Sequence, residues 1–389
     1  MLRGLAAMLV VYNHAALFLA LWPQSVGGES WLAPDDATAR MGAIGVDLFF
    51  VISGFVMALT AARFSGAHGA GTFLALRFVR IAPLYYLACL AMLALVINPG
   101  TQVGRETLLN SITFIPVFDD ERYSWPVHYL GWTLAFEFVF YAFVAALVAT
   151  GLSSRPLVLL AMVACVPLAG FAVDIDLAVW RVTTNPIVWE FGLGVVAYMI
   201  WRRGWLRRLG LPLALGFGAA VIGIALVLWI APEDMALLSR GTIHGDNTIL
   251  RVLCWGVPAW LCFCTVVAWA GNRPAGGGRA GRLLRWLAKA LGDASYSIYL
   301  SHLGVVLVLQ KLVARVPLPA DLVVIGAMIV SAIVGVMVYR AIEAPLLRIG
   351  QQLVRDLVRK DREETAQARR PARADDPGPR RSLPGHQQH

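Results

Sequence analysis

Three ionisable side chains lie deep inside apolar stretches of the sequence. His14 lies in the first stretch, residues 2–22, and Glu137 and His302 lie in two later ones. At about 1.5 Å per helical residue, each is roughly 12 to 16 Å from the end of its stretch, near the middle of a ~30 Å hydrocarbon layer. Because an ionisable group is costly when it faces lipid, the sequence predicts that the three meet in one polar cavity. A histidine that only hydrogen-bonds a neighbouring helix is the alternative for any one of them.

Two arginines, Arg77 and Arg80, stand three residues apart where the third apolar stretch begins. Residues with this spacing share a helix face, and paired guanidinium groups can bind phosphate in bidentate fashion. The alternative is an ordinary pair of arginines that extends to the cytoplasmic interface. The sequence contains no glycine-rich phosphate loop of the nucleotide-hydrolase type, which argues against a primary pump.

Further charged residues lie near the ends of other apolar stretches. Asp47 lies near the outer end of its stretch, where it could extend the polar cavity outward. Glu190 is a weaker candidate, because a nearby proline and glycine alone would explain a kink and close packing. Arg340 and Glu343, three residues apart, are expected to form a structural salt bridge at the inner interface.

The composition places these residues in a membrane. The chain has 389 residues, of which 58% are hydrophobic and only 15% charged, with 13 Trp, and its mean hydropathy is +0.67. These values are typical of a polytopic membrane protein and exclude an ordinary soluble enzyme. The first stretch lacks a small-residue cleavage site and is expected to remain as a helix. The five cysteines lie in apolar stretches without metal-ligand spacing, so no metal site is expected.

Apolar runs of about 17 to 25 residues recur ten times and predict an all-α protein of about ten transmembrane helices. They cover residues 2–22, 43–62, 80–97, 129–149, 156–173, 186–201, 211–231, 250–270, 293–313 and 321–341. Loops rich in Lys and Arg alternate with acidic loops, which predicts that the N- and C-termini are both cytoplasmic. The longest outer loop, 98–128, is long enough to cover an outward-facing cavity.

The chain divides at the end of the last run. Residues 1–346 form the predicted transmembrane domain, and residues 347–389 form a basic tail with too few apolar residues to fold alone. Such a tail favours the anionic lipid bilayer surface, although an orientation signal that also aids solubility is the simpler interpretation. The net charge of +9 therefore reflects membrane topology and does not indicate nucleic acid as a partner.

Six motifs occur in a fixed order along the chain. They are Arg3 with His14, the stretch Gly45 to Phe55, Arg77 with Arg80, Trp132-Thr133-Leu134 with Glu137 and Tyr141, Ser295 to Tyr299 with His302, and Tyr339 to Pro345. Together they resemble the acyltransferase-3 family of integral membrane O-acyltransferases, over about residues 2 to 346. Asn13 and the pair Phe138-Val139 depart from the family's pattern. These departures leave the shape of the acceptor pocket open.

The resemblance implies an activity. Members of this family move an acyl group, usually acetyl, from acyl-CoA at the cytoplasmic face of the inner membrane to a hydroxyl of a surface polysaccharide or a related acceptor. Acyl-CoA is thus expected as a substrate, with no permanently bound cofactor. No hydrolase-like domain follows the last predicted span.

The resemblance also implies residue roles, which we join into one expected mechanism. Arg77 and Arg80 hold the phosphates of coenzyme A near Arg3, and His14 acts as general base or is itself acylated. Glu137 orients the imidazole of His14. The acceptor pocket is expected to include Asp47, Trp132, Tyr141, Tyr299 and His302.

Two other classes of protein remain open at this stage. A transporter or flippase for a polar lipid or a proton-coupled solute would also place histidine and glutamate in the membrane. The absence of an internal repeat and the paired arginines argue against it. A structural scaffold would not require three buried ionisable groups.

Overall fold

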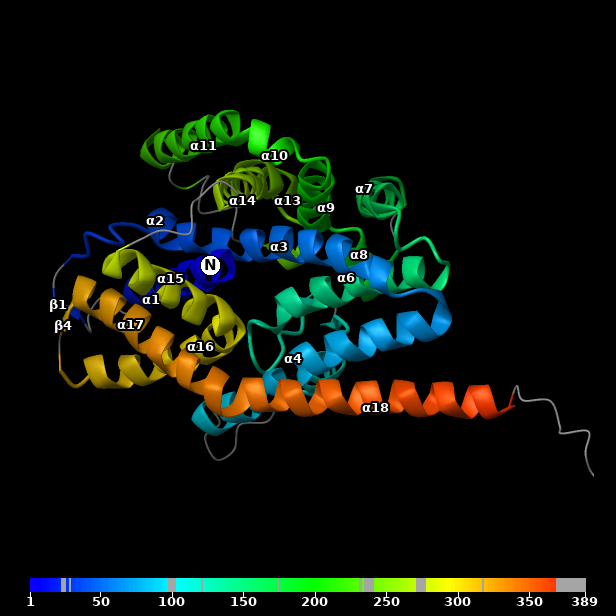
Figure 1. The fold of residues 1–389 in the computed structure, drawn as a ribbon. Coiled ribbons are helices and arrows are strands. Elements are labelled where there is room, and N and C mark those ends of the chain that lie inside the picture. Colours follow the sequence, from blue (N-terminus) through cyan, green and yellow to red (C-terminus); the bar gives the residue numbers. More distant parts are fainter. Residues whose placement is uncertain are drawn as a thin grey trace, which may run out of the picture.

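The fold is described from a computed structural model, which is all-α as predicted (Figure 1). The structure describes residues 1–21, 26–27, 29–96, 103–119, 122–173, 175–230, 233, 241–270, 278–316 and 318–368. In this part of the chain, strands occur only as two-residue pairs. β1 (Val26–Gly27) pairs in parallel with β4 (Leu318–Pro319), and β2 (Phe118–Asp119) pairs antiparallel with β3 (Arg122–Tyr123).

Twelve helices of more than ten residues make up most of the described chain. They are α1 (Leu2–Leu21), α3 (Ile44–Thr60), α4 (Gly66–Val96), α6 (Gly131–Ala149), α7 (Pro156–Ala172), α9 (Trp189–Arg202), α11 (Gly210–Ile230), α14 (Val257–Ala270), α15 (Arg279–Asp293), α16 (Ser295–Val313), α17 (Ala320–Val338) and α18 (Ala344–Ala368). Short helices include α2 (Asp36–Arg40), α5 (Arg105–Thr113), α8 (Ala178–Thr183), α10 (Trp205–Arg208) and α13 (Thr248–Arg251), and two π-helical turns span Val252–Gly256 and Tyr339–Glu343.

The ten predicted apolar runs each contain a helix, but the helices differ in length. Eight helical segments of the described chain are long and apolar enough to cross a membrane. The other two predicted runs hold α7, of 17 residues, and α9, of 14 residues. At about 1.5 Å per residue, α9 rises only about 21 Å. Asn185 caps a separate turn, Pro186–Val188, so α9 begins only at Trp189.

Glycines let the central helices approach closely. A Cβ on Gly54 of α3 would lie 2.0 Å from the carbonyl oxygen of Phe191 in α9, and one on Gly194 would lie 2.1 Å from that of Val51. Gly45 makes the same kind of contact with α1, where a Cβ would lie 2.3 Å from the Ala6 oxygen. Small residues at such crossings allow helix backbones to pack in lipid. These glycines therefore let α3 pack closely against α9 and α1.

Helix α1 lies at the centre of the site-bearing part of the fold. It packs against α3, α16 and α17. This arrangement brings the N-terminal helix, which carries Arg3 and His14, against α16, which carries His302.

The C-terminal region corrects the prediction of an unfolded tail over residues 347–389. Residues 347–368 continue α18, which lies alongside α4 (Figure 1). Gly350 fits against Val79, where an added Cβ would lie 2.3 Å from a methyl carbon, and Val354 is buried. An apolar stripe on α18 thus lets the tail fold by packing on α4 rather than alone. Residues 369–389 lie outside the described residues.

The predicted outer loop 98–128 also contains regular structure. Helix α5 and the β2–β3 hairpin lie within it, while residues 98–102 and 120–121 are outside the described residues. Asn110 on α5 donates a hydrogen bond to the Ser124 carbonyl, at 2.5 Å. The segment is therefore a folded element rather than an irregular loop.

Candidate active site

Two histidines from different helices meet in the interior. Nε2 of His302 lies 3.2 Å from Nδ1 of His14, and the ring centroids are 5.0 Å apart. His302 is fully buried, whereas His14 is partly exposed to a cavity. The prediction that these two residues converge is correct, and the packing of α1 against α16 is the cause.

One pair of tautomers satisfies all the hydrogen bonds of the two rings, with the Nδ1–H of His14 shared between two acceptors. Nδ1 of His302 lies 3.2 Å from the Ile298 carbonyl, and Nδ1 of His14 lies 2.9 Å from the Val10 carbonyl. A carbonyl accepts only, so both Nδ1 atoms carry hydrogen. Nε2 of His302 then accepts from Nδ1–H of His14. The remaining nitrogen, Nε2 of His14, is unprotonated and has no hydrogen-bond partner among the described residues.

His14 opens onto a cavity of about 380 Å³. Its polar and aromatic lining residues are Asn13, His14, Phe18, Arg40, Tyr129, Trp132, Arg251, Tyr299 and Gln310. Oδ1 of Asn13 is buried without a hydrogen-bond partner in the described chain, so this lining offers an unused acceptor. Such a cavity, with a basic nitrogen and several hydrogen-bonding groups, suits a hydroxyl-bearing substrate.

Aromatic rings form one wall of this cavity. Tyr129 lies edge-on to the His14 ring at 6.3 Å, and Trp125 stacks on Tyr129 at 4.6 Å. The Tyr129 hydroxyl is protonated at neutral pH, so it can donate a hydrogen bond into the cavity. Sequence reasoning missed Tyr129, although the neighbouring Trp125 and His128 marked this segment as unusually rich in aromatic residues.

Glu137 does not contact His14, which corrects the predicted orienting role. Its Oε1 accepts a hydrogen bond from Ser53 at 3.2 Å and a short one from Tyr141. Glu137 instead lines a separate small cavity of about 50 Å³ with Arg3 and Tyr296. The carboxylate lies on a different side of α6 from the side that faces the histidines. How α6 is rotated about its axis cannot be predicted from the depth of Glu137 in the membrane. His302 takes the place beside His14 that was predicted for Glu137.

Arg3 connects the small cavity to the inner arginines. Its Nε donates to Ser295 at 3.2 Å, and its guanidinium lies 5.8 Å from the centre of the Phe49 ring. Arg3 is attracted to the Glu137 carboxylate, with which it shares the small cavity, and is repelled by the guanidinium of Arg80. Arg3, Glu137 and Arg80 are therefore close enough to form one charged region.

Tyr299 lies between the two cavities and lines both. Its hydroxyl hydrogen-bonds Oγ1 of Thr133 at 2.8 Å. Trp132 lines the His14 cavity, as predicted, whereas Tyr141 is bound to Glu137. Tyr299 is thus the side chain through which the polar region around Arg3 adjoins the histidine cavity.

Asp47 is paired rather than exposed to the cavity. Its carboxylate is fully buried and accepts two hydrogen bonds from Arg251, at 2.9 and 2.7 Å. Arg251 itself lines the His14 cavity. The prediction that Asp47 extends the cavity is therefore wrong, and its arginine partner occupies that position. Glu190 lies beside this pair against Gly256, where an added Cβ would be 3.1 Å from Oε1.

The inner arginines line a separate cavity of about 480 Å³. Arg80 pairs with Glu343 through Nη1 and Oε1 at 3.0 Å, so the predicted Arg340–Glu343 salt bridge is wrong. The other oxygen of Glu343 accepts from Ser297 at 2.5 Å. The π-helical turn at Tyr339–Glu343 places Glu343 in the interior, whereas Arg340 is exposed.

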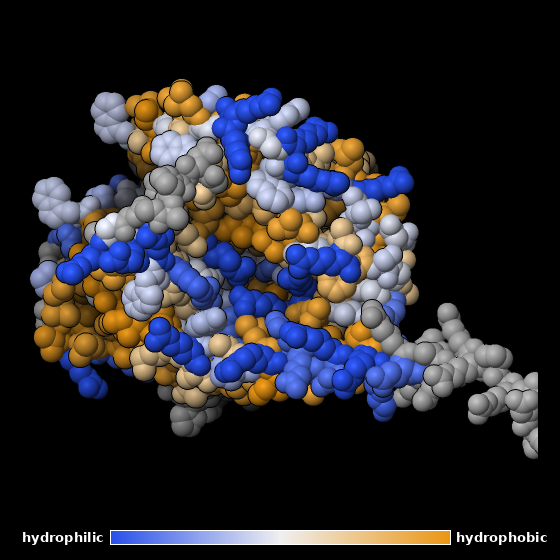
Figure 2. Space-filling view, in the orientation of Figure 1, coloured by the Kyte–Doolittle hydropathy of each residue, from blue (hydrophilic) through white to orange (hydrophobic). Residues whose placement is uncertain are grey.

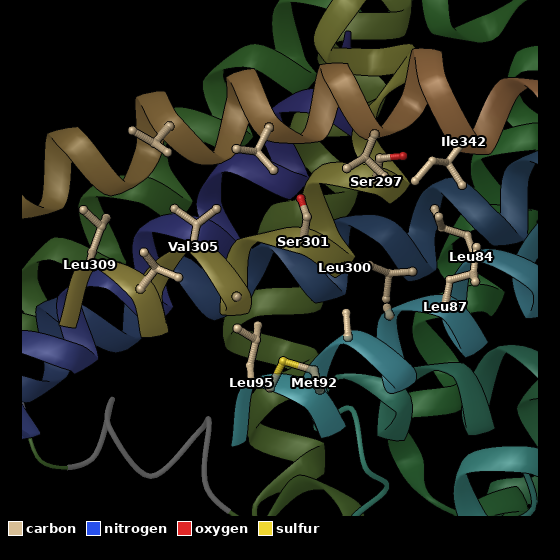
Figure 3. A pocket seen from close by; sticks show the side chains of 17 residues that line it. Leu84, Leu87, Met92, Leu95, Ser297, Leu300, Ser301, Val305, Leu309 and Ile342 are labelled. Carbon is tan, nitrogen blue, oxygen red and sulfur yellow. The ribbon is translucent and has the colours of Figure 1, made fainter. Parts of the chain in front are cut away.

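A further cavity, of about 460 Å³, is apolar (Figure 3). Side chains from α4, α16 and α17 line it, among them Leu84, Met92, Leu300 and Val305, and its only hydroxyls are those of Ser297 and Ser301. No titratable side chain lines it, so it cannot supply acid–base chemistry. Elsewhere in the described part of the chain, no group of three His, Cys, Asp or Glu residues could hold a metal ion.

The chain is similar to known proteins over most of its length. Residues 1–340 match the model of the acyltransferase-3 family, described as an acyltransferase domain. The exopolysaccharide production protein ExoZ of Rhizobium meliloti (strain 1021) is 33% identical over 317 residues, 80% of this chain and 91% of that protein. Protein 2 in the picA locus of Rhizobium radiobacter is 39% identical over 95 residues, 24% of this chain and 41% of that protein. No solved structure matches the chain significantly.

Proposed function

Because the chain belongs to the acyltransferase-3 family of membrane acyltransferases, we propose that it transfers an acyl group to a hydroxyl of an extracytoplasmic polysaccharide. The donor is acyl-CoA, with acetyl as the acyl group. The protein resides in the inner membrane with both termini in the cytoplasm. The similarity to a protein of exopolysaccharide production, over 91% of that relative, supports the choice of acceptor.

The observation that carries this proposal is the paired arrangement of His14 and His302. The unprotonated Nε2 of His14 belongs to a ring that opens onto the cavity, while its Nδ1–H is held by His302 and the Val10 carbonyl. This is the arrangement of a general base whose second nitrogen is oriented by an acceptor. The imidazole is ready to accept a proton without first changing tautomer.

The reaction follows from this geometry. Nε2 of His14 accepts the proton of the acceptor hydroxyl, whose oxygen attacks the thioester carbonyl carbon. The bond from that carbon to sulfur then breaks, and the imidazolium returns the proton to the departing thiolate. The products are an ester and free coenzyme A. General-base assistance of this kind typically contributes about 10² to 10⁴ in rate.

The two ends of the polar region suit the two proposed substrates. The arginines Arg77 and Arg80 bind the phosphates of the donor at the inner end. Arg3 and Tyr299 lie along the way to His14, where the thioester must arrive. Tyr129 and Trp132, which line this cavity, face the acceptor, because sugar rings pack well on aromatic faces.

The first test is the mass of surface polysaccharide from cells that carry the wild-type protein or His14→Ala, before and after mild base. We expect a base-labile increment only with the wild type. His244→Ala is the matched control, since that histidine is exposed and lies against Phe118 in the outer segment. An increment that persists in His14→Ala would refute the role of His14. No increment in any strain would refute the polysaccharide acceptor.

A further inference from the structure

Helix α18 contributes two arginines to the cavity of the inner arginine pair. The cavity has a volume of about 480 Å³, and its polar lining consists of Thr72, Arg77, Arg80, Gln351, Arg355 and Arg359. The first three lie on α4 and the last three on α18. Four guanidinium groups therefore surround one space between two helices. We call this space the arginine basin.

The sequence spacing places these groups on facing sides. Arg77 and Arg80 share one face of α4, and Arg355 and Arg359, four residues apart, share one face of α18. Val354 and the contact of Gly350 with Val79 seat α18 against α4. In Figure 2, hydrophilic residues gather on this side of the molecule over α18 and beside a hollow. The two arginine pairs therefore approach the basin from opposite walls.

The positive charge in the basin exceeds what nearby acids balance. Arg80 is paired with the buried Glu343, at 3.0 Å. Arg359 has only loose contacts on its own helix, 3.7 Å to Asp356 and 3.9 Å to Glu363.

Within the described part of the chain, the other two guanidinium groups contact no carboxylate. Nε of Arg77 is buried without a hydrogen-bond partner in the described chain, while its guanidinium lies 5.2 Å from the centre of the Phe73 ring. Arg355 donates a long bond to Gln351, at 3.4 Å. Like charges gathered in this way disfavour the contact of α4 with α18 unless an anion enters. A ligand that carries several phosphates would supply that anion.

We propose that α18 completes the donor site, so that Arg355 and Arg359 bind the phosphates of acyl-CoA together with Arg77 and Arg80. This inference rests on the proposed function, which supplies the donor. Coenzyme A carries a diphosphate and a separate phosphomonoester, and two arginine pairs on opposite walls match two anionic groups. The matched family domain ends at residue 340, before α18 begins at Ala344. The assignment thus extends the donor site into a segment beyond that domain.

The test measures binding of coenzyme A to the full-length protein, purified in neutral detergent, by titration calorimetry. In Arg355→Gln/Arg359→Gln we expect about a tenfold rise in Kd, because each exposed charge pair contributes modestly. Arg355→Lys/Arg359→Lys should recover part of the loss. The control is Arg348→Gln/Lys360→Gln, which removes the same charge from the same helix at positions that do not line the basin. Pantetheine, which lacks phosphate, should bind all variants equally.

Each outcome separates the inference from the function on which it rests. If the wild type binds coenzyme A and Arg355→Gln/Arg359→Gln binds it equally well, α18 is not part of the donor site and the inference is wrong. If that variant instead loses retention of phosphatidylglycerol in nanodiscs while coenzyme A binding is unchanged, the basin holds a lipid headgroup, which also overturns the inference. If the wild type binds no coenzyme A, the proposed donor is wrong and the inference falls with it.

Discussion

Replacement of His302 by phenylalanine tests the assignment of His14 as an oriented general base. Phenylalanine keeps a ring of similar size in this fully buried position but removes the nitrogen that lies 3.2 Å from Nδ1 of His14. A hydrogen bond to a group that becomes charged is worth about 1.5–3 kcal/mol, and each 1.36 kcal/mol changes a rate tenfold. The Val10 carbonyl still accepts from the same Nδ1–H. We therefore expect kcat to fall about 10- to 100-fold, less than in His14→Ala.

The assay is the initial rate of labelled acyl transfer from acyl-CoA in membrane vesicles. KM for the donor should stay unchanged in His302→Phe, because the arginine basin lies elsewhere. His302→Gln should recover part of the rate, since its amide oxygen can accept the same hydrogen bond. Thermal unfolding in detergent shows whether each variant is folded. A folded His302→Phe with kcat within twofold of the wild type, or with only a raised KM, would refute the assigned tautomers and the orienting role.

The remaining predictions concern a buried ion pair, a close helix contact and the hydrogen bonds of Glu137. Asp47→Ala removes the carboxylate that accepts two hydrogen bonds from the buried Arg251, so the free energy of unfolding should fall by about 3–5 kcal/mol, measured by thermal or denaturant melts. Gly54→Ala should cost about 1–3 kcal/mol through overpacking, whereas Gly218→Ala, where an added Cβ meets no atom within 4 Å, should not; equal melts would refute this. Glu137→Gln should leave the pH dependence of kcat unchanged, because Glu137 does not contact the general base; a shifted pH profile would contradict that.

In the proposed mechanism, the histidine pair explains how acyl transfer could take place in a buried position. The two neutral rings are held by each other and by backbone carbonyls, so neither requires a charged partner while the site is empty. Charge appears on His14 only when the acceptor hydroxyl gives up its proton. An uncharged resting site avoids the cost of a permanent ion in the membrane interior. A histidine–glutamate pair would incur that cost, because its carboxylate is charged.

The sequence by itself determined the class of the protein and the residues worth inspecting. Length, hydropathy and the run pattern predicted an all-α membrane protein, and the ten apolar runs each contain a helix. His14 and His302 were recognisable because a titratable group inside an apolar run is costly wherever it points. That cost depends only on the residue type and its depth in the membrane, so it can be inferred from the sequence without knowing which residues lie nearby.

The tertiary structure decided which of these residues meet. Glu137 contacts Tyr141 rather than His14, and Glu343 pairs with Arg80 rather than with Arg340. Asp47, which was expected to extend the cavity, instead pairs with Arg251. A partner depends on how each helix is rotated and which helix packs beside it, and depth alone contains no such information. The same reason explains why the C-terminal tail was predicted to be unfolded: α18 is stabilised by α4, a surface that exists only after the chain has packed.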